Sequence, residues 1–251
     1  MAASSGQLIS SNLHPRSSPR PGRRAAAAWL YGEPGLSELG GIYAQGSGVW
    51  ILELQTSHLQ LFYSTEHVST LAWSPDGLKL AVEVGPPGLN HQIAVIDTRD
   101  GSEISRFSGE QPAWNPTSQE IVMKACNPEC GLWKVGFDGK SGQLLTNDST
   151  DSYPDWSLDG RYIVFTSRFR TGDWEIYRLT PADLQWIRLT NRPGSDTTPV
   201  FSPDGLEIYF RTDAFGEWQI HAMSLDGRDE RVVVDDVGLS EDWGLARPAV
   251  H

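Results

Sequence analysis

Acidic residues recur just before the first strand of successive repeats in this 251-residue chain, and carboxylates that converge can do chemistry. Asp151, Asp196 and Asp242 come from different repeats, so a ring-shaped fold could bring them together at its centre. Glycoside hydrolysis requires two or three such acids, with pairs about 5–9.5 Å apart. The three acids are equivalent within the repeat, however, and this instead suggests a repeated structural role or an acidic ring for a cation.

Aromatic and basic residues accompany these acids in two sets of predicted loops. One set enters the first strand of each repeat, and the other joins the second strand to the third, so both are expected at one mouth of a central channel. Aromatic and Arg side chains commonly anchor binding surfaces. The alternative is that Asp and Thr cap turns while the aromatic rings fill gaps between repeats. The residues predicted to bind a partner are Asp151, Tyr153, Arg168, Phe169, Arg170, Asp196, Thr198, Phe215, Asp242 and Trp243.

Other recognisable catalytic arrangements are missing from the sequence. A Gly-x-Ser-x-Gly nucleophile elbow needs a strand-to-helix turn, and no helical segment is predicted to carry one. The sequence contains neither a cluster of His residues nor a phosphate-binding loop. His221 lies in a strand-like run and is expected on a sheet surface. We therefore predict a chain that is not an enzyme, with no catalytic residue and no cofactor.

Cys126 and Cys130 are the only cysteines, and they lie in a predicted loop between the second and third strands of one repeat. Antiparallel strands can bring such a pair within disulfide reach, which would imply an oxidising compartment. The alternative is a pair of free thiols in a cytosolic loop. Two cysteines without two further ligands nearby form an incomplete set, so no metal site is predicted.

The strands that position all these residues follow a repeated sequence motif, here called the phrase. It consists of an aromatic residue, Ser, Pro, Asp and Gly, and a predicted strand comes directly after it. Its aromatic members are Trp73, Trp114, Trp156 and Phe201, separated by 41, 42 and 45 residues. Four strand-like runs fill each interval, and tight Asp-Gly turns connect several of them. This period with four strands per repeat is typical of a β-propeller blade. The repeated aromatic residues are therefore expected in the core, and Asp76, Asp159 and Asp204 in turns.

The two ends of the chain complete the predicted blade count. Residues 39–44, 49–54 and 59–63 look like second, third and fourth strands, and residues 245–250 look like a lone first strand. The C-terminal strand would then complete the N-terminal blade and close the ring, which removes two exposed sheet edges. The sequence thus predicts an all-β propeller of five four-stranded antiparallel blades. A six-bladed ring cut short is the alternative.

This repeat resembles the Pro-Asp variety of WD-like propeller repeats, as in the propeller domain of the bacterial periplasmic protein TolB. The resemblance rests on the Pro-x-Trp-Ser-Pro-Asp-Gly phrase and on strands such as Trp174-Glu175-Ile176-Tyr177, and it covers about residues 36–250. Asn115, Thr117 and Leu158 depart from the phrase, and rings of this family usually have six blades. The family includes envelope scaffolds and peptidase substrate-gating domains, so the resemblance implies the fold more strongly than a function.

Charge and composition limit the partners. Residues 1–35, a Ser/Pro/Arg-rich segment, are predicted to form a disordered basic tail, and residues 36–251 a single propeller domain. The net charge of −12 argues against nucleic acid, which requires clustered Lys and Arg. No signal peptide or transmembrane helix is recognisable. We predict a binding scaffold for a protein, peptide or glycan that does not insert directly into a membrane. Its expected location is extracytoplasmic, in the periplasm or at the cell surface. The alternatives are a glycan-active hydrolase with inward carboxylates and a sensory module of a larger envelope protein.

Overall fold

The computed structural model describes residues 9–10, 24–29, 48–53, 58–65, 68–85, 91–126, 128–168 and 170–235. These residues form five antiparallel sheets of four strands each, which confirms the predicted all-β propeller architecture. No helix in this part of the chain has the length and apolar character needed to span a bilayer. In chain order the sheets consist of β1 (Ile9–Ser10), β2 (Arg24–Trp29), β3 (Gly48–Glu53) and β4 (His58–Ser64); β5 (Val68–Trp73), β6 (Lys79–Val84), β7 (Gln92–Asp97) and β8 (Glu103–Ser108); β9 (Glu110–Trp114), β10 (Glu120–Cys126), β11 (Cys130–Gly136) and β12 (Gly142–Leu144); β13 (Ser152–Trp156), β14 (Ile163–Ser167), β15 (Glu175–Thr180) and β16 (Gln185–Arg188); β17 (Asp196–Phe201), β18 (Glu207–Thr212), β19 (Gln219–Ser224) and β20 (Arg231–Val234).

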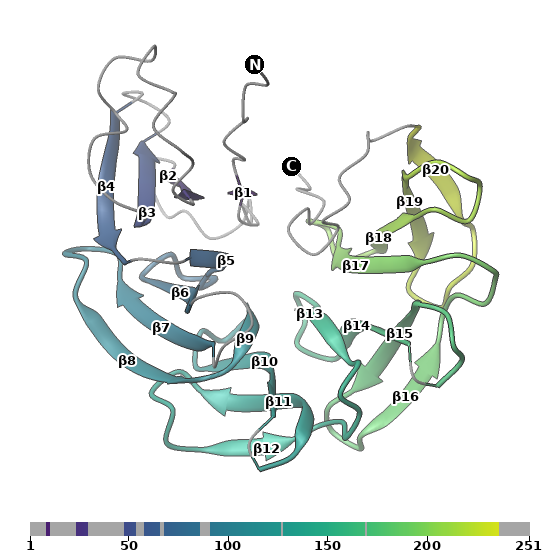
Figure 1. Ribbon diagram of the computed structural model, residues 1–251, viewed down its shortest axis with the longest axis horizontal. Helices are drawn as coiled ribbons and strands as arrows, with labels where there is room; N and C mark the ends of the chain where they lie inside the picture. The colour runs from purple at the N-terminus through teal and green to yellow at the C-terminus, as the bar shows by residue number, and fades with distance from the viewer. Residues whose placement is uncertain are drawn as a thin grey trace, which may run out of the picture.

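The sheets lie around a common centre as the blades of a propeller do (Figure 1). The first strands β5, β9, β13 and β17 lie nearest the centre, and β8, β12, β16 and β20 lie at the periphery. Within each blade the strands pair in chain order, so consecutive strands are always hydrogen-bonded neighbours. Every first strand after β5 also packs against the first strand of the preceding blade, which places the start of each repeat at a seam between two blades.

The repeated phrase forms the turn between the first and second strands. In the fourth blade Ser157 donates a hydrogen bond from Oγ to Oδ1 of Asp159 (2.7 Å) and accepts one from the backbone N–H of Tyr162 (2.9 Å). Ser202 and Asp204 repeat this contact at 2.6 Å. Gly160 has a positive φ of 72°, which glycine adopts without strain. The predicted turn role of these Asp residues is therefore met by hydrogen bonds within the turn.

Apolar layers between neighbouring blades form the core. Trp114 and Ile121 of the third blade pack with Ala81 and Ile93 of the second, and all four are buried. The indole N–H of Trp114 also donates to the backbone carbonyl of Ala72 at 2.9 Å, across the same seam. Because each inner blade is covered on both faces, its central strands are apolar on both faces, as in buried parallel sheets.

The N-terminal blade differs from the prediction. Its first and second positions are filled by β1 and β2, which belong to the segment predicted to be a disordered tail. The strand β2 pairs with β3 over its whole length, from Arg24 opposite Glu53 to Trp29 opposite Gly48. The physical reason is that β3 would otherwise leave an unpaired edge of backbone groups, and a short Ala-rich run satisfies it. The predicted strands at residues 39–44 and 245–250, including ring closure by the latter, lie outside the described residues.

Candidate binding face

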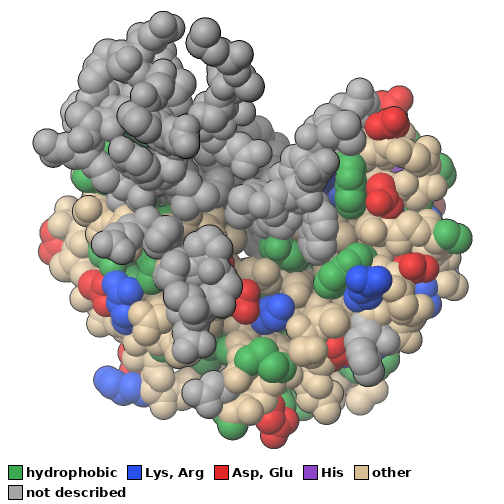
Figure 2. All heavy atoms as spheres, viewed as in Figure 1, with side chains coloured by type: hydrophobic (Ala, Val, Ile, Leu, Met, Phe, Trp, Pro, Cys, Tyr) green, Lys and Arg blue, Asp and Glu red, His purple; other side chains and the backbone are tan. Residues whose placement is uncertain are grey.

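One end of the propeller carries the loops that were predicted to bind a partner. The first strand of each blade starts at this end and the second strand finishes there, because they pair in antiparallel register, as Asp196 does with Thr212 and Ser152 with Thr166. We call this end the mouth face. It comprises residues 110–111, 151–153, 167–168, 170–174, 195–198 and 212–218, together with residues 91, 126 and 130. Figure 2 shows acidic and basic side chains close to one another on the propeller surface, with hydrophobic side chains between them.

Asp151 and Arg170 lie close together at the mouth face, but they form an ion pair with each other. The carboxylate of Asp151 is completely buried and accepts two hydrogen bonds from the guanidinium of Arg170, one of them at 3.0 Å. Burial lowers the pKa of Arg170, but the hydrogen bond and the charge of Asp151 outweigh burial and hold that pKa above its ordinary value. The same guanidinium lies 4.8 Å from the ring centre of Trp186. This arrangement is a clamp that ties the loop residue Arg170 to Asp151, at the start of the first strand.

Asp196 is bound in a second clamp, through a residue that sequence reasoning missed. Arg192 donates to Oδ1 of Asp196 at 2.9 Å and to both carboxylate oxygens of Glu230 at 2.7 and 2.8 Å. The other oxygen of Asp196, Oδ2, is buried and has no hydrogen-bond partner among the described residues. Burial is the main reason that the pKa of Asp196 is raised, although Thr212 and Arg192 act in the opposite direction. Arg192 lies in a polar loop without any periodic signal that could have identified it.

Stability should therefore depend on pH through Asp196 in a defined direction. Because its pKa is raised in the folded chain, the unfolded chain releases this proton first, at the ordinary Asp value of 3.8. Stability contributed by the protonated group is consequently lost as pH rises through the raised value. Asp196→Asn has no such proton, so its free energy of unfolding should rise relative to wild type between about pH 4 and about pH 7. Denaturant unfolding of both proteins at the two pH values measures this difference, and a fall would contradict it.

Tyr153 and Thr198 occupy a repeated backbone position at the seams. Both have positive φ, 51° and 49°, as does Gln111 at 56°, where the register of the first strand shifts. The backbone N–H of Thr198 donates to Thr166 Oγ1 of the preceding blade at 3.1 Å, and that of Tyr153 to Gln111 Oε1 at 2.8 Å. Thr198 is completely buried. These contacts between blades support the structural alternative for both residues.

Phe215 and Arg168 remain available at the mouth face. Phe215 is 62% exposed, and its ring stacks on that of His221 with 5.4 Å between ring centres. The guanidinium of Arg192 lies 5.4 Å from the centre of the same ring. Arg168 is exposed and donates from Nε to the carbonyl oxygen of Gly172 at 3.0 Å. The other predicted binding residues, Phe169, Asp242 and Trp243, lie outside the described residues.

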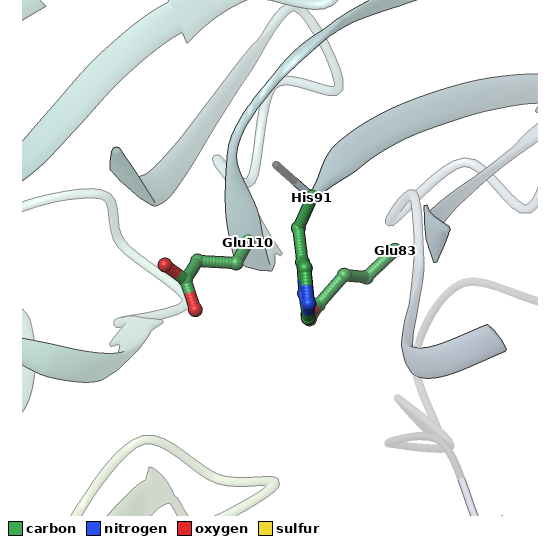
Figure 3. A group of neighbouring side chains, drawn as sticks. All are labelled: Glu83, His91 and Glu110. Carbon is green, nitrogen blue, oxygen red and sulfur yellow. The ribbon is translucent and has the colours of Figure 1, made fainter. Parts of the chain in front are cut away.

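Two buried glutamates, Glu175 and Glu83, were missed because they lie in strands that look apolar. Glu175, the first residue of β15, is completely buried and pairs with Arg188. Glu83, in β6, is 3% exposed and contacts His91, with Glu110 nearby (Figure 3). Burial raises the pKa of Glu83, but hydrogen bonds from His91, Thr70 and the Gln111 backbone outweigh burial and lower it overall. A single acid within an otherwise apolar strand was the available signal.

Cys126 and Cys130 are joined by a disulfide bond. The two residues lie directly opposite each other at the end of the β10–β11 hairpin. The bond therefore closes this hairpin at the mouth face, and no cysteine of the chain is free.

Known proteins with a similar sequence point to the same fold. No protein-family model matches the chain. An uncharacterized protein of Agrobacterium fabrum is 25% identical over 207 residues, which is 78% of this chain and 68% of the relative. The Tol-Pal system protein TolB of Francisella tularensis subsp. mediasiatica is 42% identical over 74 residues, 29% of this chain and 17% of TolB.

Comparison with solved structures also indicates a propeller fold. TolB from Acinetobacter baumannii has a TM-score of 0.71 at 17% identity, covering 93% of this chain and 55% of that structure. The chain thus spans little more than half of a TolB structure and a small part of the TolB sequences that it matches. Similar propellers also occur in a prolyl endopeptidase and in an oligogalacturonate lyase. The chain has a β-propeller fold like that of the TolB structures, and this fold is shared by binding proteins and enzymes.

Proposed function

We propose that this chain is a non-catalytic propeller that binds a protein or peptide at its mouth face. The observation that carries the proposal is Phe215, an aromatic ring that is 62% exposed yet held in place by stacking on His221 and by Arg192. A rigid, exposed aromatic ring loses little conformational freedom on binding and is a frequent energetic centre of protein interfaces. Arg168, on the neighbouring blade, adds an exposed cation to the same face.

The clamps at the mouth face weigh against the hydrolase alternative. Glycoside hydrolysis needs two carboxyl groups free to act as acid and as nucleophile or base. Asp151 is held by Arg170, and Asp196 is held by Arg192. Both carboxylates are buried and serve the packing of loops against blades. A binding role therefore accounts for the arrangement better than catalysis does.

An extracytoplasmic location is part of this proposal. A disulfide between Cys126 and Cys130 persists in oxidising compartments such as the periplasm. The matched segment of the Tol-Pal system protein TolB favours the same assignment. Within the proposal, the partner is a protein of the bacterial envelope and the propeller is its docking module.

Truncating Phe215 tests the mouth face as the binding surface. Envelope proteins captured by the tagged chain would be identified by mass spectrometry, and the purified partner titrated against wild type and Phe215→Ala. Loss of a central aromatic anchor should weaken binding about 30-fold, corresponding to about 2 kcal/mol. Leu206→Ala is the matched control, because Leu206 is 66% exposed in a turn at the opposite end of the same blade. Equal affinities for wild type and Phe215→Ala would contradict the assignment.

A further inference from the structure

Three potential metal ligands meet at the seam between the second and third blades. Glu83 lies near the end of β6, His91 directly precedes β7, and Glu110 begins β9. One ligand atom from each side chain lies within 4.8 Å of the others. In Figure 3 the side chains of Glu83 and His91 converge, and the carboxylate of Glu110 lies on the far side of His91 from Glu83.

Glu83 is fixed by the surrounding strands so that one oxygen faces His91. Its Oε2 accepts hydrogen bonds from the hydroxyl of Thr70 at 2.5 Å and from the backbone N–H of Gln111 at 2.9 Å. Its Oε1 lies 2.5 Å from Nδ1 of His91. The backbone carbonyl of His91 in turn accepts from the N–H of Gly109 at 3.1 Å. The side chain of Glu83 and the backbone of His91 are therefore held by the fold before any ligand arrives.

Glu110 differs from the other acids at the mouth face. Asp151 and Asp196 each have an Arg partner, whereas Glu110 has no ion pair or side-chain hydrogen bond within the described residues. It is partly exposed, so solvent ions can reach it. A carboxylate without an ion pair or hydrogen bond among the described residues, beside the paired Glu83 and His91, is the arrangement expected of a ligand.

We propose that Glu83, His91 and Glu110 bind one first-row divalent cation, of the Zn²⁺ or Mn²⁺ type. Carboxylate oxygens and an imidazole nitrogen are ligands that such ions accept together, whereas Mg²⁺ and Ca²⁺ prefer oxygen ligands alone. For the ion to bind, Nδ1 of His91 must carry no proton, and Nδ1 and Oε1 of Glu83 must move apart from their separation of 2.5 Å. Three protein ligands leave coordination positions open to water or to a carboxylate of a partner.

The bound cation would connect two blades. Glu83 and His91 belong to the second blade, and Glu110 belongs to the first strand of the third. An ion that binds the folded chain but not the unfolded chain raises stability in proportion to the logarithm of its concentration. Binding at this seam is therefore expected to raise the midpoint of thermal unfolding. This inference does not depend on the proposed partner, because it concerns the chain and the ion alone.

Calorimetric titration of the untagged chain with ZnCl₂ and with MnCl₂ tests the proposal. We expect one ion per chain and a higher unfolding midpoint for at least one metal, with little effect of MgCl₂. Glu110→Gln changes a carboxylate that makes no ion pair or hydrogen bond within the described residues, so it should keep the metal-free unfolding midpoint and lose at least about tenfold in affinity. Glu129→Gln is the control, because Glu129 is an exposed acid in the nearby β10–β11 hairpin. His91→Asn provides a second ligand variant.

Two results would overturn the proposal. One is the failure of both metals to bind wild type with a dissociation constant below about 1 mM. The other is binding that remains unchanged in Glu110→Gln and in His91→Asn, since the ion would then be held elsewhere. Equal losses in Glu110→Gln and Glu129→Gln would likewise refute a specific site, because they would indicate attraction to the general negative charge of the chain.

Discussion

Replacing Glu175 with Ala is expected to lower the free energy of unfolding by about 3 kcal/mol. Glu175 is completely buried and holds Arg188 through an ion pair. The hydroxyl of Thr190 donates to Oε2 of Glu175 at 2.6 Å, and the backbone N–H of Arg192 donates at 3.3 Å to Oε1, the oxygen that pairs with Arg188. Removing the carboxylate leaves the cation of Arg188 half-buried without its partner and breaks the contact that joins β15 to the loop after β16. Denaturant unfolding measures the loss.

Glu207→Ala is the control for this prediction. Glu207 also pairs with an arginine, Arg231, but both side chains are substantially exposed. Exposed ion pairs contribute about 0–1 kcal/mol, so this variant should remain close to wild type. If the two variants lost the same stability, burial would not be the property that makes Glu175 important.

Replacing Phe165 with Ala is expected to cost about 3–5 kcal/mol. Phe165 is completely buried in the layer between the third and fourth blades. Its ring stacks on that of Tyr177 with 5.6 Å between centres. The truncation leaves a cavity at a seam whose two sides are rigid sheets, so the neighbouring side chains can fill little of it. For a domain of this size the midpoint of thermal unfolding should fall by about 6–20 °C.

Tyr177→Phe separates packing from polar burial at the same place. The hydroxyl of Tyr177 is buried without a hydrogen-bond partner in the described part of the chain. Removing a buried polar group that is unsatisfied while keeping the ring should leave stability unchanged or raise it. A loss comparable to that of Phe165→Ala would show that the hydroxyl makes an important contact.

The clamps around Asp151 and Asp196 indicate that these two acids of the mouth face have a structural role. Their Arg partners neutralise them and tie loops to the blades. Catalysis by these two groups would require breaking the clamps, whereas binding through Phe215 would not. The loops are thereby held in fixed positions before a partner arrives, and preorganisation of this kind reduces the entropy lost on association.

Much of the fold was predictable because the turns and strands of each repeat are specified by residues close together in the sequence. The Ser-x-Asp-Gly turn is specified within a few residues by side-chain to backbone hydrogen bonds and by a positive φ. Strands such as β14 (Ile163–Ser167) are specified by their β-branched and aromatic residues. The N-terminal blade was not predictable in this way, because the Ala-rich β2 has weak strand propensity and forms only where β3 offers an unpaired edge.

The candidate site was predictable in outline but not in its pairings. The amino-acid sequence by itself determined which loops share one end of the propeller, since antiparallel strands alternate in direction and the repeat counts them. Only the tertiary structure decided which charges meet, because Arg170, Arg192 and Glu83 find partners across loops and seams. The pairing of a charged side chain depends on burial and on contacts between residues distant in sequence. Neither produces a periodic pattern in the amino-acid sequence.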